Sequence, residues 1–419
     1  MDRVIFHCDL NNFYASVELL DHPELKYLPV AVCGNPSSRH GIILAKNEPA
    51  KAAGVQTAET IFQAREKCPD LVLLPAHHDK YIHFSHLANR IYREYSDRVE
   101  MFGIDESWLD VTGTLHLFGC DAVALADRLR ERMRQELGLT MSVGVSFNKV
   151  FAKLGSDYKK PDATTLITPE NFRQLVWPLP VTDLLFVGRT AAKVLALCNI
   201  YTIGQLAHAD RTTLQIMLGK QGPQLKEYAQ GLDHAPVAPA GYRPPPKSVG
   251  NGLTFPRNLL GEREVRTGVA LLADQVSTRL RKHGLKCTTV QVVIRDPQFK
   301  DLHHQRRLSV PTFLSSELVD TAIELISQRW SWRLPIRALT LTAAGLIPEV
   351  ETGEQLNLFY PNSSGHRQRL EHLEKTVDSI RNRYGSAAIG RASLLDPTLK
   401  HTTPTPTAIS ELSNRRKYT

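Results

Sequence analysis

Hydrophobic and polar positions in the first 165 residues predict a small sheet accompanied by helices. Apolar runs predict four short strands, over residues 3–8, 99–102, 108–111 and 141–146. Apolar positions at helical spacing predict three helices, over residues 13–20, 79–96 and 121–137. When the irregular stretch 24–76 is set aside as an insertion, the order becomes β-α-β-β-α-β. This is the ferredoxin-like arrangement, which brings the end of the first strand beside the central hairpin.

The pattern of predicted secondary structure changes after residue 165. Residues 166–232 are mainly helical and contain two short turn-linked helices at 185–204, and the Pro-rich stretch 233–246 is typical of a semi-rigid linker. Residues 247–348 mix strand-like and helical runs, and 349–419 form a tail whose end predicts disorder. The expected fold class is therefore α+β with several domains.

Charge is distributed unevenly along the chain. The formal net charge is +8, and residues 233–348 contain 16 Lys and Arg against 9 Asp and Glu. A concentrated basic region favours a polyanionic partner such as nucleic acid.

Other compositional features narrow the class of protein. The six cysteines are scattered without zinc-ligand spacing, so neither a disulfide framework nor a zinc site is expected. No apolar run approaches the length of a membrane helix, and the N-terminal apolar stretch is too short and too charged for a signal peptide. We therefore expect a cytoplasmic protein without a membrane partner.

Three carboxylates fall at the ends of predicted strands. Asp9 follows the first strand, and Asp105 and Glu106 occupy the tight connection of the hairpin. Oxygen ligands suit Mg²⁺, which keeps positions open for substrate phosphate oxygens. Two such ions about 3.5–4 Å apart can clamp the attacking and leaving oxygens of an in-line displacement. Each residue alone could be a turn cap or a solvated charge, but the three together favour a site for two Mg²⁺ ions.

Longer motifs surround these carboxylates: residues 7–18 (HCDLNNFYASVE), 102–112 (FGIDESWLDVT) and 142–161 (SVGVSFNKVFAKLGSDYKKP). In this order and spacing they resemble the catalytic motifs of the Y-family DNA polymerases, above all the branch that contains bacterial DNA polymerase IV (DinB) and UmuC. The resemblance extends from residue 1 to about residue 350. It implies a template-directed DNA polymerase of low fidelity that performs translesion synthesis in DNA damage tolerance.

The same resemblance implies a domain organisation. Residues 1–23 and 77–165 correspond to the palm, and 24–76 to the fingers inserted in it. Residues 166–232 correspond to a helical thumb with a helix-hairpin-helix, and 247–348 to the α+β little finger.

The metal ligands and the nucleotide site also follow from the resemblance. Asp9 and Asp105 match the aspartates that ligate both metal ions, and the carbonyl of Leu10 matches a main-chain ligand. Glu106 matches the carboxylate that holds the catalytic metal beside the primer 3′-hydroxyl. Phe13 and Tyr14 belong to the nucleotide site, where Tyr14 matches the aromatic steric gate that collides with a ribose 2′-hydroxyl. Lys160 matches a lysine that contacts the incoming triphosphate.

The predicted fingers depart from the family pattern. Where the family often has a hydroxyl residue, a tyrosine and an arginine, this chain has Ala45, Glu48 and Lys51. Lys51 keeps the positive charge for nucleotide binding but loses the bidentate geometry of arginine. Glu48 would repel a triphosphate unless Lys46 or a metal neutralises it.

The expected DNA contacts lie in the thumb and the little finger. Gly188 and Arg189 in the predicted helix-hairpin-helix would bind a phosphate through backbone N–H groups. The remaining expected contacts lie in the little finger and are Lys247, Ser248, Arg295, Arg306 and Arg307.

Two features of the tail suggest protein partners. Gln355, Leu356, Leu358 and Phe359 in QLNLF resemble the peptide that binds the bacterial sliding clamp. An apolar stripe at helical spacing either docks a regulator, such as a UmuD-like protein or a recombinase, or packs on its own domain. It consists of Leu370, Leu373, Val377, Ile380 and Tyr384.

Two other classes of function compete with a monomeric active polymerase. A nucleotide cyclase can use a similar palm with two metals, but the thumb-like and little-finger-like segments argue against it. The second alternative is a catalytically weak or inactive DNA-repair scaffold of the same fold. Ala45 and Glu48 favour this alternative, whereas the three carboxylates argue against it.

Overall fold

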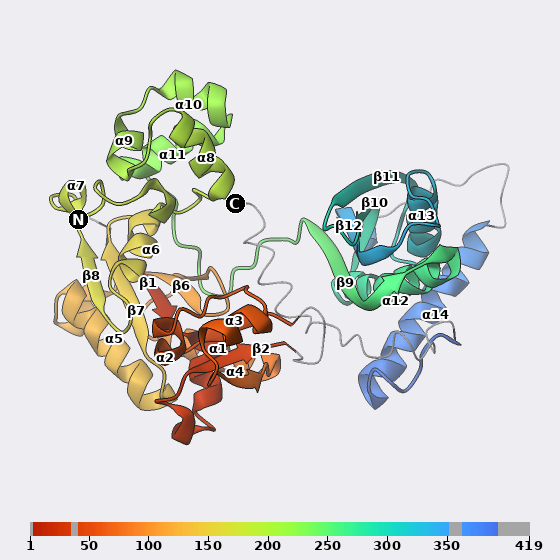
Figure 1. Ribbon diagram of the computed structural model, residues 1–419, viewed down its shortest axis with the longest axis horizontal. Helices are drawn as coiled ribbons and strands as arrows, with labels where there is room; N and C mark the ends of the chain where they lie inside the picture. Colours follow the sequence, from red (N-terminus) through yellow and green to blue (C-terminus); the bar gives the residue numbers. More distant parts are fainter. Residues whose placement is uncertain (1–2, 35–40, 352–362, 393–419) are drawn as a thin grey trace. The chain divides into compact units, whose positions relative to one another are not determined.

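The computed structural model describes residues 3–34, 41–351 and 363–392 (Figure 1). These residues form two compact units, and the chain passes from the first to the second between Arg243 and Pro244. None of the helices within the described ranges is long and apolar enough to cross a membrane.

The central sheet of the first unit has five strands in the order β5-β6-β1-β7-β8 (Figure 1). In this order they are β5 (Val99–Met101), β6 (Glu106–Asp110), β1 (Ile5–Leu10), β7 (Met141–Ser146) and β8 (Thr164–Ile167). Strand β1 is antiparallel to both β6 and β7, whereas β8 is parallel to β7. The first four strands have the predicted ferredoxin-like arrangement. The fifth strand was not predicted from the hydrophobic pattern.

Helices cover both faces of this sheet. They are α4 (His78–Arg93), α5 (Ala122–Leu137) and α6 (Lys149–Tyr158). Helix α1 (Phe13–Leu19) packs against α4. Because side chains alternate along a strand, Phe6, Cys8 and Leu10 enter the core shared with α4 and α5. The intervening side chains of His7 and Asp9 contact residues of α6 on the opposite face. The carboxylate of Asp9 therefore lies on the α6 side of the sheet.

Two glycines bring α6 close to the sheet. A Cβ atom on Gly144 of β7 would lie 1.9 Å from the carbonyl oxygen of Ala152, and one on Gly155 would lie 3.0 Å from the Cα of Gly144. This close approach places Lys153 and Ser156 of α6 within hydrogen-bonding distance of β1 side chains.

The segment inserted after α1 forms a small sheet in the order β3-β2-β4. Its elements are β2 (Val30–Cys33), β3 (Ile43–Lys46), α2 (Glu48–Ala52), α3 (Ile61–Lys67) and β4 (Val72–Pro75). Asn47 caps α2 by accepting from the backbone N–H of Ala50, and Thr60 begins α3 with a capping box to Gln63. The core of this segment is built mostly from small side chains such as Ala31, Cys33 and Ala50.

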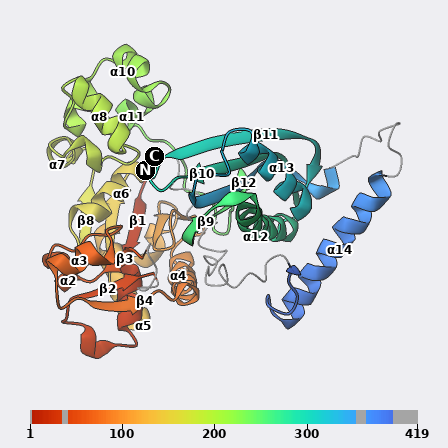
Figure 2. The same ribbon diagram turned by 45° about the vertical axis from the view of Figure 1, so that its right-hand side comes forward.

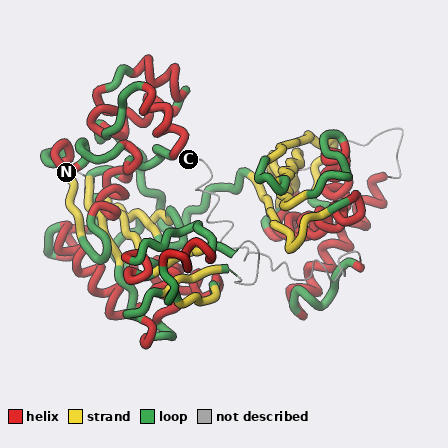
Figure 3. The backbone as a smooth tube through the Cα atoms, viewed as in Figure 1, coloured by secondary structure: helices red, strands yellow, loops and turns green. Residues whose placement is uncertain are grey.

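Residues 172–229 form a cluster of helices, drawn in red at the top of Figure 3. The helices are α7 (Phe172–Leu175), α8 (Arg189–Leu197), α9 (Ile203–His208), α10 (Arg211–Leu218) and α11 (Gln221–Ala229). Helices α8 and α9 are the expected short pair, and they share an apolar core that includes Leu195, Ile203 and Leu206. Four short 3₁₀-helices also occur among the described residues: η1 (Pro23–Leu25), η2 (Leu115–Phe118), η3 (Val181–Asp183) and η4 (Glu349–Glu351).

The first part of the Pro-rich stretch 233–246 is docked on the first unit. Val237 is fully buried beside Ile5 and Trp108, and the backbone N–H of Ala240 donates to the carbonyl of Asp97 at 2.7 Å. The prediction of a semi-rigid spacer therefore does not describe these residues, because burial of one apolar side chain ties the segment to the sheet.

The second unit contains an antiparallel sheet in the order β11-β10-β12-β9 (Figure 2). Its elements are β9 (Ser248–Leu259), α12 (Gly261–Lys282), β10 (Leu285–Arg295), β11 (Asp301–Thr312), α13 (Ser315–Ser327) and β12 (Ile336–Pro348). Val290, Val292 and Ile294 of β10 alternate into the core shared with α12 and α13. This is the α+β composition expected for 247–348.

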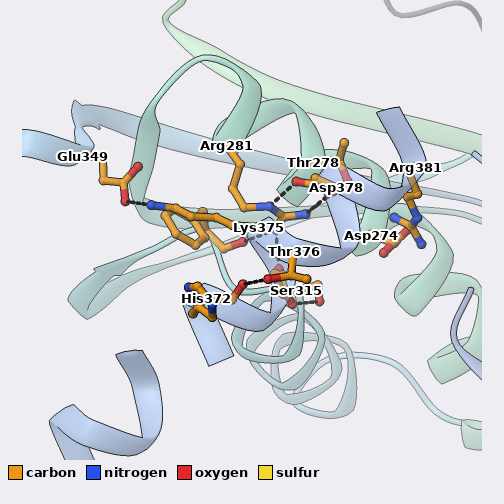
Figure 4. A network of polar contacts seen from close by, with 12 residues as sticks. Asp274, Thr278, Arg281, Ser315, Glu349, His372, Lys375, Thr376, Asp378 and Arg381 are labelled. Carbon is orange, nitrogen blue, oxygen red and sulfur yellow. Dashed lines mark hydrogen bonds and ion pairs between the residues drawn. The ribbon is translucent and has the colours of Figure 1, made fainter. Parts of the chain in front are cut away.

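Helix α14 (Ser363–Tyr384) belongs to the same unit as β9–β12. Its contacts with α12 and α13 are mainly polar. Arg281 donates to Asp378 (Figure 4). Arg281 also donates to Glu374, which accepts in addition from Ser315. The predicted apolar stripe packs only in part, because Leu370 contacts the core whereas Leu373 is 56% exposed and Tyr384 is 66% exposed. Charged side chains of α14 thus face the domain.

Candidate active site

Asp9 and Glu106 are directly opposite each other on neighbouring strands. In the antiparallel pairing of β1 with β6, Asp9 is the register partner of Glu106, and both residues are buried. Directly opposed side chains of like charge destabilise a sheet unless something neutralises them.

Lys153 supplies that neutralisation. Its Nζ atom lies 3.1 Å from Oδ2 of Asp9 and 3.2 Å from Oε2 of Glu106, so one ammonium group bridges the two carboxylates. The same atom lies 3.1 Å from Oδ2 of Asp157, one helical turn further along α6.

Lys160 completes a ring of four charges with Asp9, Lys153 and Asp157. Its Nζ atom lies 2.8 Å from Oδ2 of Asp9 and 2.7 Å from Oδ1 of Asp157. Burial lowers the pKa of both lysines, but the neighbouring carboxylates outweigh it and the pKa of each is raised. Burial likewise raises the pKa of Asp157, but the two lysines outweigh it and lower that pKa. All three groups therefore remain charged near neutral pH.

Asp105 is drawn to the same place through the backbone. The N–H of Leu10 donates to the carbonyl of Asp105 at 3.0 Å, and the N–H of Phe102 donates to the carbonyl of Glu106 at 2.9 Å to close the hairpin. The hydrogen bond between Leu10 and Asp105 thus joins the end of β1 to the hairpin, and it brings the predicted ligands Asp9, Leu10 and Asp105 to one edge of the sheet.

A pocket of about 380 Å³ opens over these groups. It is lined by both the sheet and the inserted segment, through Asp9, Leu10, Asn12, Phe13, Tyr14, Leu44, Ala45, Lys46, Thr57, Gly103, Ile104, Asp105, Glu106, Lys153, Asp157 and Lys160. The sequence-predicted residues Asp9, Asp105, Glu106, Tyr14 and Lys160 therefore share one cavity.

The oxygen donors at this edge of the sheet are of the type that binds a divalent cation, but their side chains do not form a preorganised coordination site. Asp9, Asp105, Glu106 and the Leu10 carbonyl offer the oxygen ligands that Mg²⁺ prefers. Among the described residues, no group of three or more His, Cys, Asp or Glu side chains is close enough together to hold a metal ion. In this arrangement a cation is nevertheless bound between two of the carboxylates, namely the ammonium of Lys153.

His7 lies between Ser156 and Glu106 in the interior of the domain. It is fully buried, its Nδ1 atom lies 2.8 Å from Oγ of Ser156, and its Nε2 atom lies 3.5 Å from Oε2 of Glu106. Burial and the charge of Lys153 lower the pKa of His7. Its ring restrains the Glu106 side chain on the side away from the pocket.

Tyr14 has a well-defined platform. Its ring stacks on Tyr81 of α4 with centroids 4.0 Å apart, and His78 meets it edge-on. Tyr81 is fully buried and its hydroxyl donates to Glu18, whose carboxylate also contacts His77 at 3.1 Å. These contacts hold the Tyr14 ring in one orientation at the wall of the pocket.

In the inserted segment, the position of Lys51 differs from the one expected. Lys51 is not among the residues that line the pocket, and its Nζ atom lies 3.6 Å from Glu48. Oε1 of Glu48 also accepts from Asn12 at 3.0 Å. Lys46 lines the pocket instead, together with Thr57, to which it donates at 3.2 Å. Among the described residues of this segment, the positive charge nearest the pocket therefore comes from β3 rather than α2.

The residues proposed for DNA binding are divided between the two units. Gly188 is the N-cap residue of α8 and Arg189 is exposed at its first turn. Lys247 is exposed just before β9, which begins at Ser248. The exposed positions Arg189 and Lys247 are accessible to a phosphate backbone.

The three arginines of the second unit have different environments. Arg295 forms two hydrogen bonds with Asp301, its register partner on β11, each at 2.7 Å. Arg306 pairs with Glu324 of α13, on the face covered by helices. Arg307 is the register partner of Thr289 and is exposed. Because consecutive residues of a strand point to opposite faces, Arg306 and Arg307 lie on opposite faces of the sheet.

The predicted clamp-binding residues Gln355, Leu356, Leu358 and Phe359 lie outside the described residues. They follow η4 and precede α14 in the chain.

Sequence reasoning missed Lys153 and Asp157. Both lie in the motif 142–161, but the helix that carries them was not predicted. Their spacing of four residues would have placed Lys153 and Asp157 on one side of a helix.

Comparison with known proteins gives consistent results over both units. Residues 8–157 match the family model described as the impB/mucB/samB family. Residues 246–358 match the model for the C-terminal domain of the same family.

Individual relatives cover nearly the whole chain. The DNA polymerase IV of Acetivibrio thermocellus is 48% identical over 395 residues, which is 94% of this chain and 98% of the relative. The DNA polymerase IV of Pelotomaculum thermopropionicum is 37% identical and covers 94% of this chain and 96% of its own. The DNA polymerase IV 1 of Bacillus subtilis is 35% identical, over 94% and 93%.

A solved structure has the same fold. A Y-family DNA polymerase chimera of Dbh and Dpo4 superposes with a TM-score of 0.73 over 82% of this chain and 99% of the chimera, at 21% sequence identity.

Proposed function

This chain belongs to the impB/mucB/samB family of Y-family DNA polymerases, and we propose that it performs translesion synthesis by two-metal nucleotidyl transfer at Asp9, Asp105 and Glu106. It is a DNA-directed DNA polymerase of the DNA polymerase IV type, and its substrates are primer–template DNA and deoxynucleoside triphosphates. The proposal concerns the metal ligands, the mechanism and the tolerance of damaged templates.

The observation that carries the proposal is the grouping of the carboxylates with a nucleotide-sized pocket. Asp9, Asp105 and Glu106 line a cavity whose other walls contain Tyr14 and Lys160. Carboxylates can bind the metal ions that hold a phosphate, and a lysine can pair with a triphosphate. An aromatic ring can pack against the face of a sugar.

Members of this family use divalent metal ions, and we propose two Mg²⁺ ions here. Bound metal would stabilise negative charge on the attacking and leaving oxygens of an in-line displacement. Asp9, Asp105, Glu106 and the carbonyl of Leu10 would hold the ions. Lys160, which is partly exposed beside Asp9, would exchange that carboxylate for the triphosphate.

Tyr14 and Phe13 would select the sugar. Because the Tyr14 ring is stacked on a buried tyrosine, it has little freedom to retreat from a 2′-hydroxyl. A deoxyribose lacks this group and would be accepted.

The remaining parts would hold DNA and partners. We propose residues 1–23 and 77–165 as the palm, 24–76 as fingers, 166–232 as thumb and 247–348 as little finger. Gly188, Arg189, Lys247, Ser248 and Arg307 would contact phosphates without reading sequence. Arg295 and Arg306 would first have to leave Asp301 and Glu324.

A sliding clamp would bind QLNLF, at Gln355, Leu356, Leu358 and Phe359 in the segment before α14. This peptide would compensate for an active site that holds DNA weakly, because tethering converts rebinding into an intramolecular event. We propose that the protein acts in the cytoplasm, at the bacterial nucleoid.

Primer extension on undamaged and lesion-bearing templates tests the proposal. Asp105→Asn and Glu106→Gln should each reduce nucleotide incorporation with Mg²⁺ by roughly 1000-fold or more, about 4 kcal/mol of transition-state stabilisation. DNA binding measured by fluorescence anisotropy should persist. Asp97→Asn, an exposed position outside the pocket, is the matched control. Substantial extension by the Asp105 and Glu106 variants would overturn the metal assignment, and failure only on damaged templates would overturn the translesion role.

A further inference from the structure

The two buried carboxylates of Asp9 and Glu106 pose an electrostatic problem before any divalent cation binds. They are register partners on adjacent strands, and both are almost completely withdrawn from water. Two anions in this relationship repel one another strongly in a medium of low dielectric. A fold that keeps them opposed needs a cation of its own.

Lys153 provides that cation from a rigid position. Its side chain is 13% exposed, and its amine contacts Oδ2 of Asp9 and Oε2 of Glu106 at nearly equal distances, 3.1 and 3.2 Å. Helix α6 cannot move away easily, because Gly144 and Gly155 place its backbone directly against β7. The backbone position from which Lys153 reaches both carboxylates is therefore fixed by the packing of the domain, whereas its side chain can change partners.

The amine also has a second acceptor at the same site. Oδ2 of Asp157 lies 3.1 Å from Nζ of Lys153, one turn along the same helix, and Asp157 is half exposed toward the pocket. Lys153 can therefore give up Asp9 and Glu106 without losing every partner.

We propose that Lys153 is a built-in counter-ion that occupies the place between Asp9 and Glu106 in the metal-free enzyme and withdraws to Asp157 when a divalent cation binds. This inference rests on the proposed function, because it takes Asp9 and Glu106 as metal ligands. Lys153 is a positioning residue in this scheme: its charge offsets the repulsion between the two carboxylates, and a divalent cation must displace it in order to bind between them.

Lys160 has a different role from Lys153. It contacts Asp9 but not Glu106, follows the end of α6, and is more exposed at 29% of its side chain. It is suited to exchange Asp9 for an anionic substrate, whereas Lys153 spans the two carboxylates that a cation would bridge.

Binding of Mn²⁺ alone, without DNA or nucleotide, tests the proposal. The full-length parent and Lys153→Met are titrated with Mn²⁺, and free Mn²⁺ is followed by electron paramagnetic resonance. Removal of the competing ammonium should tighten Mn²⁺ binding about tenfold, which corresponds to roughly 1.4 kcal/mol. In the presence of chelator, Lys153→Met should unfold at a lower temperature than the parent, and Mn²⁺ should raise its unfolding temperature by more than it raises the parent's.

Lys149→Met is the matched control. Lys149 lies one turn earlier on α6, is 12% exposed, and pairs with Glu100 at 2.7 Å away from the pocket. This substitution removes an equally buried lysine and should lower the unfolding temperature while leaving Mn²⁺ affinity unchanged.

Asp157→Asn tests the route of displacement. It should weaken Mn²⁺ binding in the parent, because the displaced ammonium loses its acceptor, and it should have little effect in the Lys153→Met background. An equal effect in both backgrounds would show that Asp157 acts only through its charge, which overturns the proposed withdrawal of Lys153.

The outcomes separate this inference from the proposed function. If the parent binds Mn²⁺ and Asp105→Asn abolishes that binding, but Lys153→Met binds no more tightly than the parent, the counter-ion role is wrong and the metal assignment stands. If Mn²⁺ binding by the parent is insensitive to Asp105→Asn and Glu106→Gln, the metal assignment fails and the role of Lys153 fails with it.

Discussion

The ring of Tyr14 stacks on the ring of Tyr81 with centroids 4.0 Å apart and planes inclined by only 12°. Tyr81 is itself immobilised, because it is fully buried and its hydroxyl donates to Glu18. The orientation of the proposed sugar gate thus depends on a residue 67 positions away in the chain, which does not line the pocket.

Substitution of either tyrosine should relax sugar discrimination. Tyr14→Ala should raise ribonucleotide incorporation relative to deoxyribonucleotide incorporation by roughly 10–200-fold, the range available to steric selection by one side chain. Tyr81→Leu should produce a smaller increase, because Tyr14 remains but can tilt. Single-nucleotide insertion kinetics give both ratios. Tyr95→Leu removes another buried, stacked tyrosine and should leave the ratio unchanged; an unchanged ratio in Tyr14→Ala would mean that another residue forms the gate.

The two lysines of the proposed fingers should differ in their effect on nucleotide binding. Lys46 lines the pocket, whereas Lys51 pairs with Glu48 outside it. Lys46→Ala should therefore raise the KM for deoxynucleotides about tenfold, the loss of one ionic contact of roughly 1.4 kcal/mol, while Lys51→Ala should change it little. Steady-state insertion kinetics measure both. A larger effect of Lys51→Ala would require the fingers to rearrange on nucleotide binding.

Gly144 should not tolerate a side chain. A Cβ atom there would lie 1.9 Å from the carbonyl oxygen of Ala152, and backbone atoms cannot yield as a flexible side chain can. Gly144→Ala should reduce the free energy of unfolding by about 3 kcal/mol or more and shift Lys153 away from Asp9. Gly113→Ala, where the new Cβ meets nothing within 4 Å, is the control in urea unfolding. Equal stability of the two variants would contradict the close approach of α6.

Arg281 should hold α14 on the second unit. Its side chain is 5% exposed and it pairs with Asp378 and Glu374 (Figure 4). Arg281→Ala leaves two largely buried carboxylates without this partner, which should cost about 3–5 kcal/mol. Hydrogen exchange should show α14 losing protection first. Arg266→Ala on the same helix breaks an exposed pair with Asp320 and should cost less than about 1 kcal/mol.

The clamp peptide should affect synthesis of long products and not the chemical step. Replacing Leu358 and Phe359 by Ala should reduce clamp affinity roughly 30-fold, since apolar anchors of this kind contribute on the order of 2 kcal/mol. Single-nucleotide insertion on a short primer should be intact, whereas stimulation by a loaded clamp should be lost. Asn357→Ala, at the position immediately before Leu358, is the internal control. If the double variant binds the clamp as the parent does, the tether lies elsewhere.

Local pattern in the sequence was sufficient to predict that three carboxylates meet at one edge of the central sheet. Asp9, Asp105 and Glu106 stand at the ends of predicted strands, and the ferredoxin-like order of those strands determines which ends meet. Tyr14 was identified from its motif. The placement of the carboxylates depends on short-range periodicity and on topology, whereas the role of Tyr14 is what the resemblance to the family implies.

Only the tertiary structure revealed which charges neutralise one another. Lys153 reaches Asp9 and Glu106 because two glycines let α6 approach β7, and no local pattern states how closely a helix will pack. Arg306 and Arg307 were indistinguishable in sequence, since the face of β11 that is covered depends on where α13 packs. The sequence pattern of α14 likewise indicated an apolar face and did not reveal that charged side chains face the second unit. Arg281 and Glu374 are 93 residues apart in the chain, so their pairing forms only on folding. Sequence periodicity therefore predicted the acidic edge of the sheet and most of the strands and helices around it, but not β8 or α6. The pairing of buried charges was decided by long-range packing.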